Sequence, residues 1–196
     1  MERKLWVGGM LLLLGMLVPV PASAESKWNG FTLAPKLGYA WYAETSAISD
    51  LKTDDRHSFN LQLDLDFGGV GAGFDLAPYF AYEEGEESGT EGIKALGLYA
   101  GFAYRMEFGN WYPYVGFGAK IGYGFADGVD HLAEIYGRVP IGCTYYLLDD
   151  LGVLLELGLG YGVTGLQLSG GGVGAPDDFQ MGHGFYLDLM AGVRWP

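Results

Sequence analysis

Apolar and polar residues alternate in eight separate stretches of the chain. In the clearest one, 58–67, phenylalanine and leucine occupy every second position, and serine, asparagine, glutamine and aspartate occupy the others. A period of two places the apolar side chains on one face of a β-strand. The stretches are 31–41, 58–67, 70–80, 96–106, 115–125, 132–145, 153–163 and 185–195. The pattern predicts an all-β fold of eight strands.

The lengths of the stretches and of their connections favour a barrel that crosses a membrane. Most stretches are longer than the five or six residues of an ordinary strand, and they match the roughly 9–11 residues that a tilted strand needs to cross a bilayer. Tight connections at 68–69, 107–110 and 148–151 alternate with longer ones at 43–57, 83–93, 126–130 and 165–183. Short turns at one end and longer loops at the other are typical of even-stranded outer-membrane barrels.

The polar face of these strands carries a nearly balanced set of charges: Lys36, Asp64, Asp66, Asp75, Arg105, Lys120, Glu134, Arg138, Glu156, Asp188 and Arg194. This face would lie outside in a soluble barrel but would line the lumen of a membrane barrel. Most strand glycines share this face, and they leave room there for Tyr99, Tyr112, Tyr114 and Tyr136. We therefore predict an eight-stranded antiparallel up-and-down transmembrane β-barrel whose lumen is filled by an ionic network.

Aromatic residues stand at both ends of the apolar face. Phe31, Phe67, Trp111 and Trp195 mark one end, and Trp41, Tyr82, Phe125 and Phe185 mark the other. Two such aromatic girdles flank the apolar band of a membrane barrel at its two interfaces with water. Four prolines interrupt the pattern, namely Pro35, Pro78, Pro113 and Pro140. Because proline cannot donate to a ladder, we expect bulges or strand ends at these positions.

The N-terminus predicts export. A short start of net positive charge, Glu2-Arg3-Lys4, precedes an apolar run over 5–20, and Ala22-Ser23-Ala24 forms a small-residue cleavage pattern. This arrangement indicates a signal peptide over 1–24 and a mature barrel domain over 25–196. The alternative, an uncleaved anchor, is disfavoured because the apolar run is shorter than the about 20 residues of a spanning helix.

Composition excludes several classes of protein. The chain holds 34 Gly, its aromatic content is 15%, and only 18% of its residues are charged, against about 25% in a typical soluble domain. The formal net charge of −13 argues against nucleic-acid binding, which needs a basic footprint. A single cysteine excludes a disulfide framework and a cysteine-based zinc site.

Candidate catalytic and metal-binding residues are few. The three histidines, His57, His131 and His183, fall at junctions between predicted loops and strands. Ser58 adjoins His57, but neighbouring strand residues point to opposite faces, so this pair makes a poor catalytic dyad. The acidic run over 83–91 lacks the ligand spacing of an ordered calcium loop. We therefore predict no enzyme activity, no cofactor and no metal site.

From about Trp28 onward, the chain resembles the small OmpA-like outer-membrane β-barrel proteins of Gram-negative bacteria. The resemblance rests on the leader, the eight strands, the alternation of connections and the closing pattern Phe185-x-Leu187-x-Leu189-x-Ala191-x-Val193-x-Trp195. It implies insertion into the outer membrane, contact with its lipid and lipopolysaccharide, and recognition of the terminal aromatic Trp195 by the barrel-assembly machinery. Pro196, which follows Trp195, departs from the family pattern.

The resemblance also implies a structural or surface-interaction role in the cell envelope. Two other functions stay open at this point. A narrow porin-like channel or small-ligand carrier would use the glycine-lined lumen, and a lipid A-modifying enzyme would need a catalytic set that the histidines supply poorly. A filled lumen favours the first role, because eight strands enclose an interior that side chains can just fill.

Overall fold

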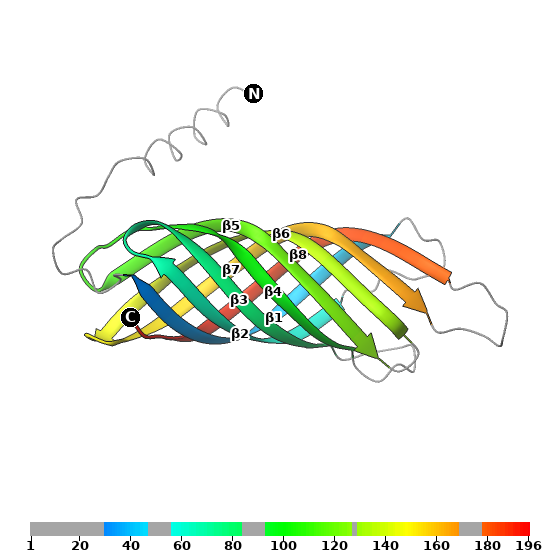
Figure 1. Ribbon diagram of the computed structural model, residues 1–196, viewed down its shortest axis with the longest axis horizontal. Helices are drawn as coiled ribbons and strands as arrows, with labels where there is room; N and C mark the ends of the chain where they lie inside the picture. The colour runs from blue at the N-terminus through cyan, green and yellow to red at the C-terminus, as the bar shows by residue number, and fades with distance from the viewer. Residues whose placement is uncertain (1–29, 47–55, 84–92, 127–128, 169–177) are drawn as a thin grey trace, which may run out of the picture.

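The computed structural model describes residues 30–46, 56–83, 93–126, 129–168 and 178–196 (Figure 1). These residues form eight strands: β1 (Phe31–Ser46), β2 (Arg56–Gly68), β3 (Gly71–Glu83), β4 (Ile93–Arg105), β5 (Trp111–Ala126), β6 (Val129–Leu148), β7 (Leu151–Leu168) and β8 (Asp178–Arg194). No helix among the described residues is long and apolar enough to cross a membrane.

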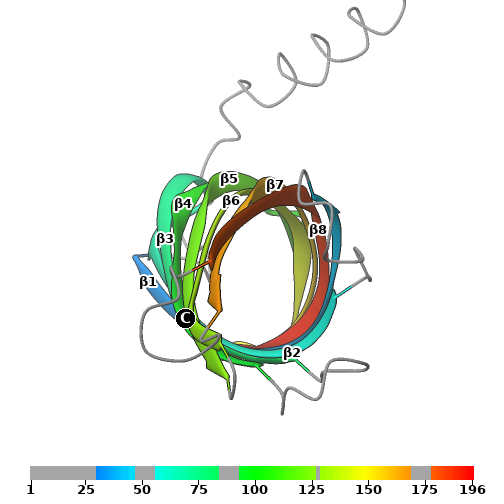
Figure 2. The same ribbon diagram turned by 90° about the vertical axis from the view of Figure 1, so that its right-hand side faces the viewer.

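The strands close on themselves. Each strand pairs with the next in antiparallel register, and β1 also pairs with β8, so the sheet is a closed up-and-down barrel. Figure 2 shows the resulting ring from its loop end. Closure gives every strand two neighbours and removes the free edges on which open sheets aggregate. The predicted fold class is confirmed.

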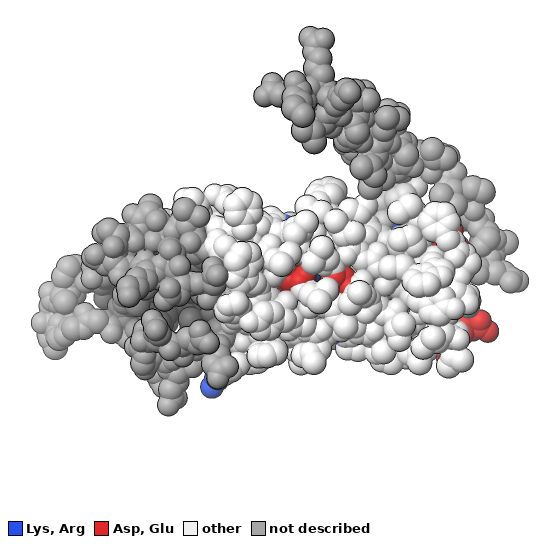
Figure 3. All heavy atoms as spheres, turned by 180° about the vertical axis from the view of Figure 1, so that it is seen from behind, with Lys and Arg blue, Asp and Glu red and all other residues white. Residues whose placement is uncertain are grey.

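Side chains alternate across the barrel wall as the sequence pattern predicts. On β2, Leu61 and Leu63 are exposed, whereas Gln62, which lies between them, and Asp64, which follows, are buried in the lumen. The same arrangement, with apolar side chains outside and polar ones inside, holds around the barrel. The exposed large side chains are apolar, and nearly all charged strand residues are buried. Figure 3 shows a wall almost free of charged atoms, with a few acidic atoms visible near its middle and at one end. The apolar surface faces lipid.

The strands run further into the long connections than predicted. β1 extends to Ser46, β7 extends to Leu168, and β8 begins at Asp178. His131 and His183 consequently lie within β6 and β8 rather than at strand junctions. The strands predicted from alternation were too short because backbone pairing, such as that of Val129 with Leu168, continues where the side chains cease to alternate.

The tight connections are confirmed at the opposite end of the barrel. β2 and β3 are joined over 69–70, and β6 and β7 over 149–150. Phe108 and Trp111 exchange two backbone hydrogen bonds of 2.8 and 3.1 Å around the turn between β4 and β5. Gly68 and Gly109 take φ values of +128° and +63° at these turns, a region that glycine enters without steric cost.

The expectation of bulges or strand ends at the prolines was wrong for three of the four. β1, β3 and β6 continue through Pro35, Pro78 and Pro140 with unchanged register, although the ladder skips two residues on each paired strand there. Only Pro113 stands where a ladder ends, since β4 and β5 pair as far as Arg105 and Tyr114. Proline removes one donor, and the ladder on the strand's other side keeps the strand in place.

The irregularities of register lie elsewhere. They occur between Gly124 and Ala126, between Val129 and His131, and between Tyr146 and Leu148. All three fall close to the ends of β5 and β6. The middle of the barrel wall therefore keeps a regular register, which fixes the side chains that point into the lumen.

Candidate functional site

All eleven charged residues predicted to line the lumen are buried in the structure. The most exposed is Asp75, at 7%, and the others lie at or below 5%. They come from all eight strands, so the barrel wall brings together residues that are far apart in sequence. Burial of this many charges requires that they be paired or hydrated, because an unpaired buried charge costs several kcal/mol.

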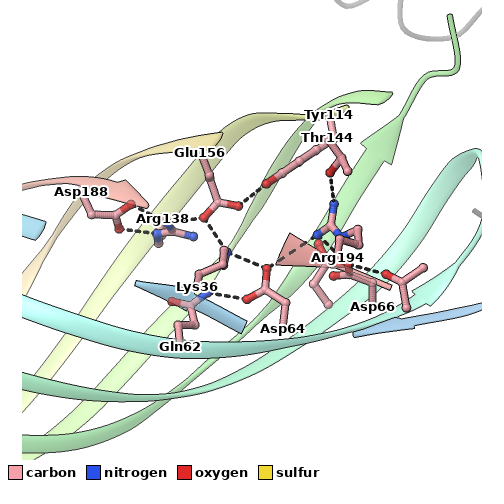
Figure 4. A network of polar contacts seen from close by, with 12 residues as sticks. Lys36, Gln62, Asp64, Asp66, Tyr114, Arg138, Thr144, Glu156, Asp188 and Arg194 are labelled. Atoms are coloured by element: carbon pink, nitrogen blue, oxygen red, sulfur yellow. Dashed lines mark hydrogen bonds and ion pairs between the residues drawn. The ribbon is translucent and has the colours of Figure 1, made fainter. Parts of the chain in front are cut away.

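Arg138 is the central member of the part of the network that lies nearer the long loops. Its guanidinium donates from Nε and Nη2 to the two carboxylate oxygens of Asp188, at 2.8 and 2.7 Å. Nη2 also donates to Glu156 Oε1 at 2.7 Å. Lys36 Nζ approaches the same Glu156 oxygen to 2.8 Å. Arg138 and Lys36 therefore share one carboxylate (Figure 4).

The network continues from Lys36 toward the short turns. Lys36 Nζ lies 2.6 Å from Asp64 Oδ2, and Arg194 Nη2 lies 3.8 Å from the same oxygen. Arg194 then contacts Asp66 Oδ2 at 2.7 Å.

Arg105 carries the network to its end. Its Nη2 lies 3.4 Å from Asp66 Oδ1 and also contacts Asp75. We call the resulting sequence Asp188–Arg138–Glu156–Lys36–Asp64–Arg194–Asp66–Arg105–Asp75 the ionic chain. Acids and bases alternate along its whole length, so each inner charge lies between two charges of opposite sign.

Uncharged groups satisfy further atoms of the ionic chain. Tyr114 donates to Glu156 Oε2 at 2.6 Å, Thr32 donates to Asp66 Oδ2 at 2.9 Å, and Gln62 donates to Asp64 Oδ1 at 2.7 Å. Arg194 Nη1 donates to Thr144 Oγ1 at 2.8 Å. Charge-assisted hydrogen bonds of this kind are about twice as strong as neutral ones.

Lys120 lies in a different setting from the one expected for an ionic network. Its ammonium group lies 4.3 Å from the ring centres of Tyr79 and Tyr186 and 5.7 Å from that of Tyr42. It donates to the Tyr186 hydroxyl at 2.9 Å and to the Tyr42 hydroxyl at 3.3 Å. Aromatic faces attract such a cation through their quadrupoles. We call Lys120 and its three tyrosines the tyrosine cage.

The tyrosine cage is connected to the other predicted lumen residues. The Tyr186 hydroxyl donates to Asp188 at the end of the ionic chain. The Tyr79 hydroxyl donates to Glu134 Oε1 at 3.2 Å. The cage thus extends the polar packing toward the long loops. Its tyrosines were missed by the sequence interpretation, although Tyr79 and Tyr186 occupy polar-face positions in the alternation, which is the signal that could have found them.

Tyrosine rings lie over glycines of the neighbouring strand. Tyr114 pairs with Gly142, Tyr79 with Gly97 and Tyr136 with Gly162. A Cβ atom added to any of these glycines would collide with the ring or the backbone of its partner. The glycines of the polar face therefore provide the space that the rings fill.

A small cavity lies within the packed lumen. Its volume is about 10 Å³, which is about the space that one buried water molecule requires. Members of the ionic chain line it together with Gln62, Tyr99, Tyr114 and Pro140. The Tyr99 hydroxyl is buried there without a hydrogen-bond partner among the described groups.

Seven of the eight predicted girdle residues lie on the outside of the barrel. Phe31, Phe67, Trp111 and Trp195 are 40–56% exposed at the end of the short turns. Phe185 and Tyr82 are exposed near the long loops, and Trp41 is half-buried. Phe125 belongs to β5, but its side chain lies outside the described part. Near the short turns, ring contacts continue from Phe67 through Phe74 and Phe102 to Phe117, which widens the aromatic girdle there.

His57 and His183 belong to no catalytic or metal cluster among the described side chains, which do not include that of His131. His57 is exposed and Ser58 is buried, so the two point to opposite faces. His183 is exposed, and its Nδ1 lies 2.8 Å from the Tyr161 hydroxyl. No group of three or more His, Cys, Asp or Glu suited to a metal ion occurs among the described residues. Residues 1–24 and most of the acidic run over 83–91 lie outside them.

Comparisons with known proteins agree with this architecture. The family model described as outer membrane protein beta-barrel domain matches residues 10–194. No curated protein matches the chain. In structure the chain is similar to the outer-membrane protein AlkL, solved in lipid bilayers, with a TM-score of 0.61 and 14% identity over 90% of this chain and 94% of that one.

Two further solved structures are similar. OprG from Pseudomonas aeruginosa has a TM-score of 0.58 and 14% identity, covering 88% of this chain and 99% of its own. Neisserial surface protein A has a TM-score of 0.55 and 15% identity, covering 85% and 97%. At these identities the likeness is one of fold.

Proposed function

Because the chain belongs to the outer membrane protein β-barrel family, we propose that it serves the cell envelope as a closed barrel with a structural or surface-interaction role. The protein lies in the outer membrane of a Gram-negative envelope, with its apolar wall in contact with membrane lipid. In this proposal the lumen holds the barrel together from inside, and the long loops carry the contacts with the outside.

The ionic chain is the observation that carries the proposal. It crosses the lumen with every inner charge between two opposite charges, and the cavity beside it has a volume of only about 10 Å³. A hydrated ion would have to separate these buried pairs to pass. Breaking a buried pair by removing one partner costs about 3–5 kcal/mol, so the closed arrangement is strongly favoured over an open path.

The proposal extends to partners and processing. The long connections hold most of the acidic residues, including Glu83, Glu84 and Glu86, so divalent cations would be needed to bridge them to anionic lipopolysaccharide. At the other end, the Trp195 and Leu33 backbones exchange two hydrogen bonds of 2.9 Å, which joins the terminal strand to β1. We propose that the assembly machinery receives this strand through Trp195, after cleavage of the leader behind Ala24.

The proposal includes no catalytic step, since His57 and Ser58 face opposite sides of the wall. The second candidate is a narrow channel or small-ligand carrier. It predicts that ions enter the lumen and that lumen charges set conductance rather than stability. The two proposals therefore predict different effects on conductance and stability when a member of the ionic chain is substituted.

Conductance of the refolded mature protein in a planar lipid bilayer tests the proposal, with urea unfolding measured in parallel. We expect no steady channel from the unsubstituted protein. Arg138→Ala removes the partner of Asp188 and Glu156 and should lower the free energy of unfolding by about 3–5 kcal/mol. Lys94→Ala is the control, because Lys94 is an exposed cation on β4 and its loss should leave the urea midpoint unchanged.

The channel proposal expects a different pair of results. A steady single-channel conductance in the unsubstituted protein, retuned by Arg138→Ala without a change in the urea midpoint, would overturn the closed barrel. Absence of conductance together with a large loss of stability in Arg138→Ala supports it.

A further inference from the structure

The seam between β1 and β8, where the first and last strands meet, has an interrupted ladder. Pairing runs from Ser46 and Gly182 down to Lys36 and Gly192, and it resumes only at the Leu33–Trp195 bridge. The skipped residues include Pro35, which has no N–H to donate. The ladder between β7 and β8, by contrast, continues without a break to Gly152 and Arg194. Gaps of the same length occur in the β2–β3 ladder at Pro78 and in the β5–β6 ladder at Pro140, but the gap at Pro35 lies where the two ends of the sheet meet.

Three ion pairs of the lumen cross this seam, and two of them are shorter than 3 Å. Lys36 on β1 reaches over β8 to Glu156 on β7, at 2.8 Å. Arg194 on β8 reaches over β1 to Asp66 on β2, at 2.7 Å. The side chains of all four residues are at most 3% exposed. Figure 4 shows both pairs side by side inside the barrel wall.

The position of these pairs matters for how the barrel closes. In an open sheet, Lys36 keeps its neighbour Asp64 and Glu156 keeps Arg138, since those partners lie on the same side of the seam. The ion pairs of Arg194 with Asp64 and Asp66 both cross the seam, so they form only when β8 reaches β1. Closure thus creates opposite-charge contacts in a space from which water is excluded, where charges interact most strongly.

We propose that the Arg194–Asp66 and Lys36–Glu156 pairs are a latch that draws the last strand onto the first and holds the seam across the ladder gap at Pro35. The latch is a step in barrel closure, and it is independent of whether the finished barrel conducts. Arg138–Asp188 provides a matched comparison, because it also spans one strand inside the lumen but does not cross the seam.

Disulfide trapping during refolding tests the latch. Leu37→Cys with Ala191→Cys reports on the seam, because these residues are register partners on the lipid face. Leu98→Cys with Ile121→Cys reports on the β4–β5 pairing in the same way. Both pairs are placed in a Cys143→Ser background, since Cys143 is the free cysteine of the chain. The mature protein refolds into phosphatidylcholine vesicles, and samples are oxidised at intervals and counted on non-reducing gels.

We expect Asp66→Asn and Lys36→Met to slow seam trapping about tenfold relative to β4–β5 trapping, because each removes one side of a pair that closure would bury. The matched control, Asp188→Asn, should leave that ratio unchanged. An equal slowing in Asp188→Asn, or an unchanged ratio in the two latch variants, would overturn the proposal.

If a latch variant fails to insert, the salt dependence of trapping tests the proposal in protein that keeps all of its latch charges. Before closure the latch charges are exposed to water, where attraction is screened within about 3 Å at 1 M salt and within about 30 Å at 0.01 M. High salt should therefore slow seam trapping and leave β4–β5 trapping unaffected. A constant ratio of the two rates across this range would contradict an electrostatic latch.

Discussion

Gly158 shows how single residues set the shape of the lumen. It lies on β7 beneath the contact between Arg138 and Asp188, and a Cβ atom there would collide with both side chains. Gly137, on the neighbouring β6, faces outward, and a Cβ atom would find only ordinary contact, 3.7 Å from the Tyr161 carbonyl oxygen. Packing in the lumen therefore requires a glycine at position 158 but not at position 137, although the two residues stand on adjacent strands.

Gly158→Ala should lower the free energy of unfolding by about 1–3 kcal/mol, because the added methyl group overpacks a filled interior. Gly137→Ala should be neutral or stabilising by up to about 1 kcal/mol, since alanine restricts the unfolded chain. Urea unfolding in lipid vesicles measures both. Equal destabilisation by the two substitutions would show that the lumen at Gly158 is not tightly packed.

Sequence alternation predicts which charges enter the lumen but not which of them meet. The partners of Lys36 lie on β2 and β7, and those of Arg194 lie on β2. The contact of Lys36 with β7 and the contacts of Arg194 with β2 skip a strand, so they depend on the curvature of the wall and on the register across the seam. Neither property can be read from a single strand. The tyrosine cage around Lys120 was missed for the same reason, because its rings come from β1, β3 and β8.

At the scale of an element, successive positions along β2 lie at different depths in the membrane. Leu63 stands near the middle of the strand, and Phe67 stands near its end at the short turns, both on the exposed face. Leu63→Arg should therefore cost about 2–4 kcal/mol, whereas Phe67→Arg should cost only about 0–1 kcal/mol, as expected for a cation at the bilayer midplane and at the interface. Unfolding in vesicles measures both costs. A larger cost at Phe67 would mean that the membrane lies elsewhere along the strand.

The strand boundaries show where prediction from alternation stops. The strand centres follow from the apolar period, because lipid selects the outward side chains there. Beyond the membrane that selection ends, so the ladders of β1 and β7 with their neighbours continue to Ser46 and Leu168 without an apolar signal. The effect of the prolines was also predicted wrongly from the strand sequence alone. A lost donor was expected to shift the register, but Pro78 sits in a strand that β4 still pairs on its other side.

For the whole molecule, closure without free edges predicts a compact and resistant barrel. Residues 25–196 should refold in detergent to a β-rich form that migrates differently before and after boiling, because the ladders have no exposed edge from which to unravel. Gel mobility and circular dichroism measure this. Unchanged mobility after boiling, or a spectrum with substantial helix, would be inconsistent with the barrel.

The alternating order of the ionic chain also limits how the protein can evolve. A change of any inner member, such as Glu156, disturbs two neighbours at once, so a tolerated change there requires a second change elsewhere. Asp188 and Asp75 end the chain, and each contacts one of its bases. Drift in the lumen should therefore begin at these two ends and move inward by paired replacements, while the apolar wall varies one residue at a time.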